Sequence, residues 1–245
     1  NSTYIMMRPL AIFSIFIFLK LREKYTVEKI NIKEWILFSL LLLVTTWFKP
    51  NFMFGFAPCM LFIMIFDFIK MRGKKVVNYI IFGTAVLPSI FLMLWQQAQL
   101  FDNSTGLEFS YFKVWDHYAK HPLMALIQSI AFPIVVLIFN YKDLIKDKIF
   151  RFGWFFAFIN LFIFIFIHEK GSRIWDGNLA WGANFAVGVL FIISMYKFID
   201  TIRQKNLQCV MVSSAVLGMH FLCWINFYLN TLKLLYFKEF IVSFF

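Results

Sequence analysis

The densest group of chemically useful side chains lies between residues 168 and 182. This run holds two carboxylates, two cations, one imidazole, three glycines and two tryptophans. The planar guanidinium of Arg173 can clamp a phosphate with two parallel hydrogen bonds. Glu169 or Asp176 can position a ligand or bind a hydroxyl, and Trp175 or Trp181 can stack on a sugar ring. The alternative is a compact turn whose charges pair with one another at the level of the lipid headgroups.

A second candidate is the short turn Lys49-Pro50-Asn51, which joins two apolar stretches. Proline breaks a helix and restricts the residue before it, so the tip of the turn is a fixed corner. The turn is too short to leave a membrane interface, which brings Lys49 to the depth of an anionic lipid headgroup. The alternative is a lysine at a helix end that simply extends its ammonium towards water.

The two segments together give one set of candidate substrate-binding residues. These are Lys49, His168, Glu169, Arg173, Asp176, Asn178 and Trp181. The sequence does not indicate which residue acts as a catalytic base.

Other polar patterns are weaker. His117 and His121 are four residues apart, as in H-E-x-x-H zinc sites, but the rest of that motif is missing. The phosphate-binding pattern G-x-x-x-x-G-K-[ST] is also missing, so ATP hydrolysis is not expected. We therefore expect neither a bound metal nor a cofactor.

Two polar residues lie within apolar runs. Asp67 is close to Lys70 in the sequence, and we expect the two to pair. His220 stands in an otherwise apolar run without a carboxylate one turn away, which favours a packed histidine over a proton relay.

The composition shows which elements must position these groups. The chain has 245 residues, of which 61% are hydrophobic and 15% charged, with a mean hydropathy of +0.74. Soluble domains contain about 45–50% apolar and about 25% charged residues, so a bilayer must surround much of this chain. The net charge of +11 is explained by basic cytoplasmic loops rather than by nucleic-acid binding.

Apolar runs bounded by charge predict the fold. A helix needs about 20 residues to cross a bilayer. We expect an all-α, polytopic transmembrane helix bundle with about eight spans, forming a single multi-pass domain over residues 1–245. The expected spans are 4–19, 35–48, 52–69, 76–95, 123–139, 152–167, 183–196 and 207–228.

The two ends of the chain raise separate expectations. The tail 232–245 is either an interfacial helix or a truncated further span. Because an apolar run follows Asn1 almost at once, we expect the chain to be the C-terminal part of a longer membrane protein.

The loops predict the orientation in a cell membrane. The connections 20–34, 70–75, 140–151 and 197–206 contain 5, 4, 4 and 3 Lys and Arg residues and alternate with less basic connections. The positive-inside rule makes these four loops cytoplasmic. The turn at Lys49, the loop 96–122 and the loop 168–182 then face outward.

Two segments resemble parts of polyprenol-dependent GT-C glycosyltransferases and their bacterial relatives. The first is Lys49-Pro50-Asn51-Phe52, followed by an apolar span with Pro58 and a basic loop. The second is the run Glu169…Gly171…Arg173…Asp176-Gly177-Asn178…Trp181-Gly182, which is similar to a late outward loop of some relatives.

The resemblance implies a membrane enzyme that takes a sugar from a polyprenyl-phosphate carrier on the outer face. Lys49 and Arg173 would contact the phosphate, and Glu169 and Asp176 would position the ligand. The acidic catalytic residue of this class lies in the first outward loop, a region that this sequence does not contain. Membrane lipids and a polyprenyl-phosphate-linked sugar are the expected partners.

Two other classes of function stay open. A transporter or flippase of lipid-linked saccharides predicts polar groups inside several spans and helices broken within the membrane. The spans here contain few internal charges, although Pro58, Pro88 and Pro133 can break helices. The third reading is a non-enzymatic membrane subunit that packs against a partner.

Overall fold

The computed structural model describes residues 2–100, 106–204 and 207–242 of the chain. Within these ranges it does not describe the side chains of residues 100, 143–145, 172–173, 231 and 233–242. The expected outward loop 96–122 and the expected cytoplasmic loop 197–206 therefore lie partly outside the described residues, at 101–105 and 205–206.

Helices make up nearly all of the described chain. The helices are α1 (Ser2–Tyr25), α2 (Ile32–Phe48), α3 (Asn51–Lys70), α4 (Val76–Thr84), α5 (Leu87–Leu100), α6 (Lys113–Tyr118), α7 (Pro122–Ser129), α8 (Ala131–Phe139), α9 (Tyr141–Lys146), α10 (Lys148–Phe166), α11 (Asn178–Arg203), α12 (Leu207–Val242) and the 3-10 helix η1 (Gly171–Asp176). Two short strands, β1 (Leu107–Phe109) and β2 (Ile167–Glu169), pair antiparallel with Glu108 opposite His168.

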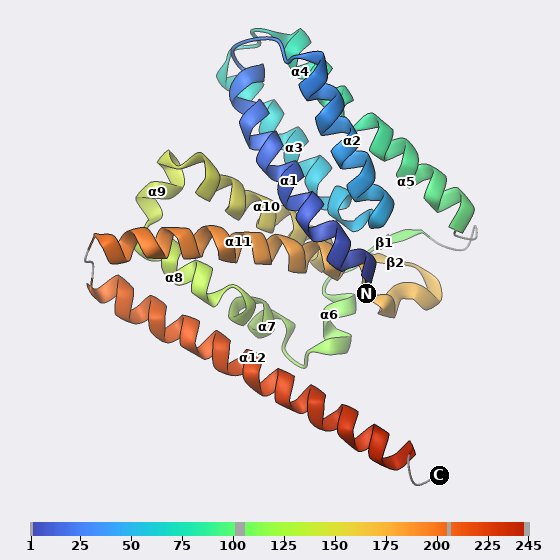
Figure 1. Cartoon of the computed structure of the whole chain (residues 1–245), viewed down its shortest axis with the longest axis vertical. Coiled ribbons are helices and arrows are strands. Elements are labelled where there is room, and N and C mark those ends of the chain that lie inside the picture. The colour runs from blue at the N-terminus through green and yellow to red at the C-terminus, as the bar shows by residue number, and fades with distance from the viewer. Residues whose placement is uncertain (1, 101–105, 205–206, 243–245) are drawn as a thin grey trace.

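The helices form two groups that meet near the strand pair. In Figure 1, α1 to α5 stand together in one group, while α8, α10, α11 and α12 run across them. α10 packs along α11, and both also pack against α3, which joins the two groups. α1 and α11 both begin beside the strand pair and lead away from it (Figure 1).

Among the described residues, six helices or helix pairs are long and apolar enough to cross a membrane. The count becomes seven if the bent pair α7–α8 is one span. The expected count of about eight is therefore not confirmed. The expected span that is too short to be counted is α2. Its 17 residues extend only about 25 Å, less than the hydrocarbon core of about 30 Å. α12 continues without a break to Val242, so the expected separate element at 232–245 is a continuation of this helix as far as it is described.

Prolines explain where two of these spans are broken. α4 ends at Thr84, four residues before Pro88, and α7 ends at Ser129, four residues before Pro133. A proline ring clashes with the carbonyl four residues earlier and offers no N–H to it. The second break bends the chain by 55°.

Side chains from neighbouring helices bond to the backbone groups that these breaks release. Trp35 Nε1 on α2 donates to the Ile81 carbonyl at 2.9 Å. Across the second break, the Phe132 N–H donates to His220 Nε2 on α12 at 3.4 Å. An unpaired backbone group in hydrocarbon costs several kcal/mol, so such partners make a broken span tolerable. His220 is thus a packed histidine that holds α8 to α12.

Phenylalanine fills the centre of the first group. Phe18 on α1, Phe56 on α3 and Phe82 on α4 are fully buried. The Phe18 and Phe56 rings lie edge to face with centroids 5.5 Å apart, and Phe18 also stacks on Phe82 at 6.0 Å. Ring pairs of this kind add about 0.5–1.5 kcal/mol beyond the area that they bury. Many of the phenylalanines are therefore packing residues rather than a ligand site.

A buried amide marks the place where α3, α10 and α11 approach most closely. Asn160 on α10 is 3% exposed, and its Nδ2 donates to the Phe156 carbonyl at 2.9 Å. A Cβ at Gly55 on α3 would lie 1.9 Å from Asn160 Oδ1. A Cβ at Gly182 on α11 would lie 2.9 Å from the Asn51 carbonyl oxygen. Only glycine at both positions lets the three helices approach this closely.

The expected partner of Asp67 was wrong. Its carboxylate accepts from Arg22 Nε at 2.7 Å and Nη2 at 2.8 Å, and from the Tyr25 hydroxyl at 2.8 Å. Lys70 lies one turn further along α3 and is exposed, whereas α1 brings Arg22 directly onto the buried carboxylate. A guanidinium can donate two parallel hydrogen bonds to a carboxylate, a bidentate geometry that an ammonium group does not offer.

Asp147 begins α10 and connects it to α11. Its carboxylate accepts from the backbone N–H groups of Ile149 at 2.9 Å and Phe150 at 3.1 Å, and it pairs with Lys197 Nζ at 2.6 Å. Partial burial disfavours the ionised form, but these bonds outweigh it, so the pKa of Asp147 lies below its ordinary value.

We expect Gly55→Ala to lower the stability of the detergent-solubilised protein by about 2–3 kcal/mol, because the new methyl group overlaps the Asn160 amide. Gly188→Ala on α11 is the matched control, since a Cβ there meets nothing within 4 Å. Thermal unfolding measures both. The cost of Gly55→Ala must shrink in an Asn160→Ala background, and an unchanged cost would contradict the close approach described above.

We expect Asp147→Asn to lower stability at pH 7 by about 0.5–1 kcal/mol, because asparagine keeps the helix cap but loses the ion pair. The lowered pKa means that the carboxylate stabilises the folded state above about pH 4 and ceases to do so as the pH falls through the folded-state pKa. Thermal unfolding between pH 7 and pH 3 should show the two proteins converging at low pH. A constant difference would refute this role for the charge.

Candidate functional site

The two segments singled out from the sequence lie side by side near the strand pair. The Asn51 side-chain amide, at the start of α3, donates to the Asn178 carbonyl, at the start of α11. The Asn178 side chain in turn donates to Glu169 Oε2 at 2.7 Å. A hydrogen-bonded chain therefore runs from the turn through α11 to β2, across residues more than 100 positions apart in sequence.

Lys49 belongs to the same group. It is only 8% exposed, and its Nζ lies 5.4 Å from the centroid of the Trp181 ring, within cation–π range. Trp181 also contacts Tyr4 on α1, with ring centroids 4.6 Å apart. Arg8 completes the row, with its guanidinium carbon 4.2 Å from the centroid of the Tyr4 ring.

Tyr4 and Arg8 were not identified from the sequence. They are four residues apart on one helix, a spacing that places them on the same face and indicates that they can touch. The sequence contains no signal that this face meets Trp181. The row of Arg8, Tyr4, Trp181 and Lys49 combines two cations with two aromatic rings, which suits a ligand that carries both negative charge and a ring.

His168 is buried within the strand pair rather than exposed to a ligand. It lies in β2, is 5% exposed, and its Nδ1 is 2.9 Å from the Glu169 carbonyl oxygen. The side chain lines a small cavity of about 10 Å³ between β2, α6 and the start of α11. A cavity of this size holds about one water molecule and is too small for a sugar or a lipid phosphate.

Asp176 and Arg173 are the remaining candidates in this loop. Asp176 lies at the end of η1 and is exposed. The neighbouring Trp175 stacks with His117 of α6 at 4.3 Å, and its carbonyl accepts from the Tyr118 hydroxyl. The side chain of Arg173 lies outside the described residues.

Charge at this end is partly neutralised. Lys170, directly after β2, pairs with Glu108 of β1 at 3.5 Å, and both side chains are about half exposed. His117 is used in the contact with Trp175, and the described residues bring together no group of three or more His, Cys, Asp or Glu side chains that could hold a metal ion.

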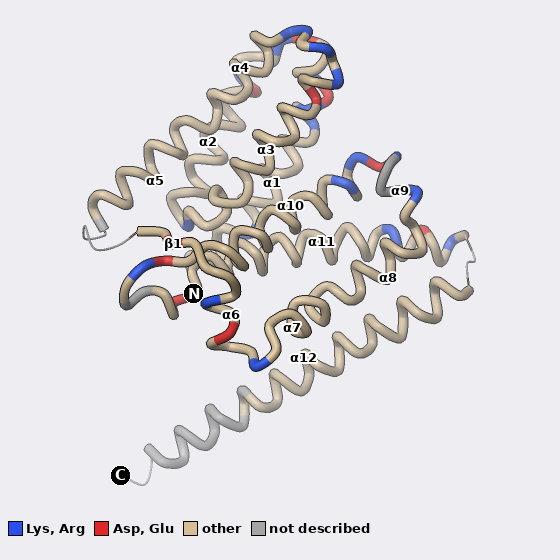
Figure 2. The backbone as a smooth tube through the Cα atoms, turned by 180° about the vertical axis from the view of Figure 1, so that it is seen from behind, with Lys and Arg blue, Asp and Glu red and all other residues tan. Residues whose placement is uncertain are grey.

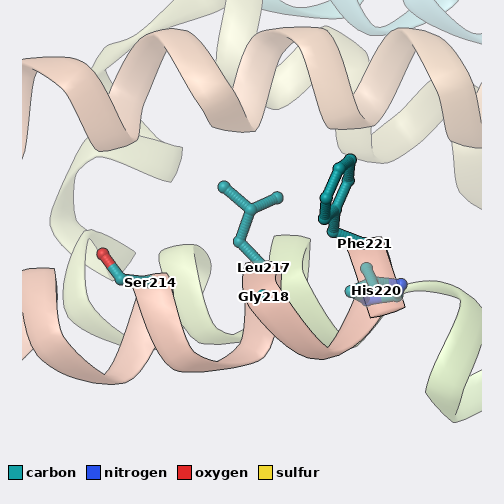
Figure 3. Close-up of a pocket in the computed structure, with 5 residues that line it drawn as sticks. All are labelled: Ser214, Leu217, Gly218, His220 and Phe221. Atoms are coloured by element: carbon teal, nitrogen blue, oxygen red, sulfur yellow. The ribbon is translucent and has the colours of Figure 1, made fainter. Parts of the chain in front are cut away.

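A second cavity, larger than the one beside His168, lies elsewhere. It measures about 560 Å³ and is lined by residues of α12: Ser214, Leu217, Gly218, His220 and Phe221. Figure 3 shows these five residues along one helix, with Leu217 and Phe221 projecting towards a neighbouring helix. Its lining is almost entirely apolar, so it offers few polar groups to a charged ligand.

Comparisons with known proteins give no family for the chain. No protein-family model matches it, and searches of curated proteins and of solved structures gave no match. The evidence for a function at the candidate site is therefore the geometry of its own residues.

We expect Asn178→Ala and Glu169→Ala to be non-additive, because each removes one side of the same hydrogen bond. A double-mutant cycle on thermal stability should give a coupling of about 1–2 kcal/mol for this partly buried, charge-assisted bond. The exposed pair Lys170 and Glu108 is the control, and its coupling should stay below about 1 kcal/mol. Additive effects of Asn178→Ala and Glu169→Ala would mean that the bond does not form.

Proposed function

We propose that the chain is part of a polytopic membrane glycosyltransferase that takes a sugar from a polyprenyl-phosphate carrier at the outer face of the cell membrane. The observation that carries this proposal is the placement of Lys49 over Trp181. It unites the two segments that resemble GT-C glycosyltransferases in one group of side chains. A cation suits the carrier phosphate, and an indole ring suits the sugar.

The proposed orientation places the strand pair outside. The connections 20–34, 70–75, 140–151 and 197–206 are cytoplasmic in this arrangement, and the bundle has about eight spans, with α2 as a short span around which the bilayer thins locally. Lys49, Trp181 and the start of α11 then lie at the outer headgroup level, where the phosphate of a lipid carrier also lies.

The proposed sugar transfer needs two kinds of group, those that bind the carrier and one that removes a proton from the acceptor. A carboxylate removes the proton from the acceptor hydroxyl while cations stabilise the departing polyprenyl phosphate. In this chain we assign Lys49 and Arg173 to the phosphate, and Glu169 and Asp176 to positioning. The bond from Asn178 fixes the orientation of Glu169. These residues are assigned to carrier binding and not to the role of catalytic base.

A transporter of lipid-linked saccharides is the second candidate. The broken spans α4–α5 and α7–α8 favour it, since transporters commonly build their binding sites from discontinuous helices. In this chain, however, Trp35 and His220 already bond to backbone groups at these breaks. These backbone groups at the breaks therefore already have partners within the chain.

We expect Lys49→Ala to weaken binding of a polyprenyl-phosphate sugar to the protein in nanodiscs by about 10- to 100-fold, the loss of one charge-assisted hydrogen bond. Lys49→Arg should retain most of the affinity, and Trp181→Ala should weaken binding of the sugar-linked carrier more than that of the bare polyprenyl phosphate. Lys170→Ala, which removes a lysine from the same end, should have little effect.

Binding that is absent, or unaffected by Lys49→Ala and Trp181→Ala, would contradict the proposal. Transfer of a labelled sugar to an acceptor distinguishes the two candidates. A transporter would move the labelled carrier across the bilayer of a vesicle without breaking the sugar–phosphate bond.

A further inference from the structure

A concentrated group of cations joins α3 to α4 at the opposite end of the first helix group. Within residues 70–75, here called the basic turn, four side chains are cationic and all four are exposed: Lys70, Arg72, Lys74 and Lys75. Figure 2 shows Lys and Arg gathered at this end of α4, far from the strand pair. The proposed glycosyltransferase site does not use this turn.

The charge of the basic turn is not neutralised by the described residues. The carboxylate nearest in sequence, Asp67, is occupied by Arg22 and Tyr25. Other cations of the basic loops have carboxylate partners, such as Lys24 with Glu34 and Lys197 with Asp147. None of the four cations of the basic turn forms an ion pair with a described residue.

The backbone of the basic turn is strained at two of its cations. Arg72 has a φ of 53° and Lys75 a φ of 58°, in the left-handed region that glycine or asparagine adopts at lower cost. At the end of α3 the Gly73 N–H bonds to the Phe68 carbonyl at 3.0 Å, a helix cap in which the left-handed position usually holds glycine. The sequence places charge at two positions where backbone conformation favours other residues. Strain of this kind indicates a functional constraint.

Apolar side chains flank the basic turn on both helices. Ile69 at the end of α3 and Val76 and Val77 at the start of α4 are exposed by 68%, 44% and 55%. Both helices belong to candidate membrane spans. The turn therefore lies where a span leaves the bilayer, with hydrocarbon beside the valines and headgroups beside the cations.

We propose that the basic turn is a binding site for an anionic glycerophospholipid, whose phosphate lies among Lys70, Arg72, Lys74 and Lys75 and whose acyl chains lie along Ile69, Val76 and Val77. Clustered cations directly after a membrane span attract anionic lipids of the adjoining leaflet. The inference is independent of the glycosyltransferase proposal, because it uses no residue of the strand-pair end.

Lipid binding to the whole purified chain in detergent tests this site. Phosphatidylglycerol and phosphatidylcholine with identical acyl chains are the probes, and native mass spectrometry counts the bound lipids. We expect phosphatidylglycerol to bind at least about tenfold more tightly than phosphatidylcholine. Replacing all four cations of the basic turn by glutamine should reduce the preference to less than about twofold.

The control removes the same charge from exposed lysines of other loops: Lys29→Gln, Lys33→Gln, Lys142→Gln and Lys146→Gln. This variant should retain most of the preference for phosphatidylglycerol. Equal losses in the two variants would show that overall net charge is responsible, and equal binding of both lipids by the unaltered protein would show that there is no anionic-lipid site. Either result overturns the proposal.

Arg72→Gly separates a role in lipid binding from a role in folding. In phosphatidylcholine nanodiscs its Tm should be no lower than that of the unaltered protein, because glycine relieves the left-handed strain. The rise in Tm caused by adding phosphatidylglycerol should be smaller in Arg72→Gly. A lower Tm in phosphatidylcholine, with an unchanged response to phosphatidylglycerol, would mean that Arg72 is kept for packing, and the proposal would fail.

Discussion

The structure depends on the close approach of α3, α10 and α11 around one buried amide. Asn160 would be costly in an apolar bundle without partners, and its bond to the Phe156 carbonyl satisfies part of its hydrogen-bonding capacity. Gly55 and Gly182 make room for it, and the absence of a side chain at Gly182 lets α11 reach the backbone of Asn51. Small residues at helix crossings serve the same purpose in many membrane bundles.

That approach also forms the candidate site. Because α3 and α11 meet at their first turns, the Lys49 turn comes beside Trp181 and the Asn178 backbone. β2 follows α10 directly, so the same packing brings Glu169 within reach of the Asn178 side chain. The arrangement of the proposed ligand-binding residues therefore depends on how closely α3 and α11 pack at their first turns.

The two ends of the first helix group use charge differently. Near the strand pair, cations lie over aromatic rings: Lys49 over Trp181 and Arg8 over Tyr4. At the opposite end, Asp67 is enclosed by Arg22 and Tyr25, and the basic turn directly beyond it keeps four exposed cations. A bilayer between these ends would meet aromatic and basic groups at each headgroup level, as the composition of membrane proteins generally requires.

The sequence by itself determined that the fold is nearly all helical and where most of its long apolar helices lie. Apolar runs of sufficient length predicted the helices, because every backbone group in hydrocarbon must bond within its own segment. The prolines alone did not show which helices break, since the chain breaks before Pro88 and Pro133 but α3 continues through Pro58. The sequence did not determine the number of spans, since α2 is at the lower limit of length for crossing a bilayer.

Only the tertiary structure decided which side chains meet. Asp67 pairs with Arg22, 45 positions away, rather than with Lys70, because helix packing and not sequence proximity sets the partner of a buried carboxylate. Tyr4 and Arg8 join the candidate site for the same reason, as α1 lies against the start of α11. Apolar periodicity specifies that a helix is buried, but the choice of neighbour depends on the shapes of facing side chains, such as Gly55 against Asn160.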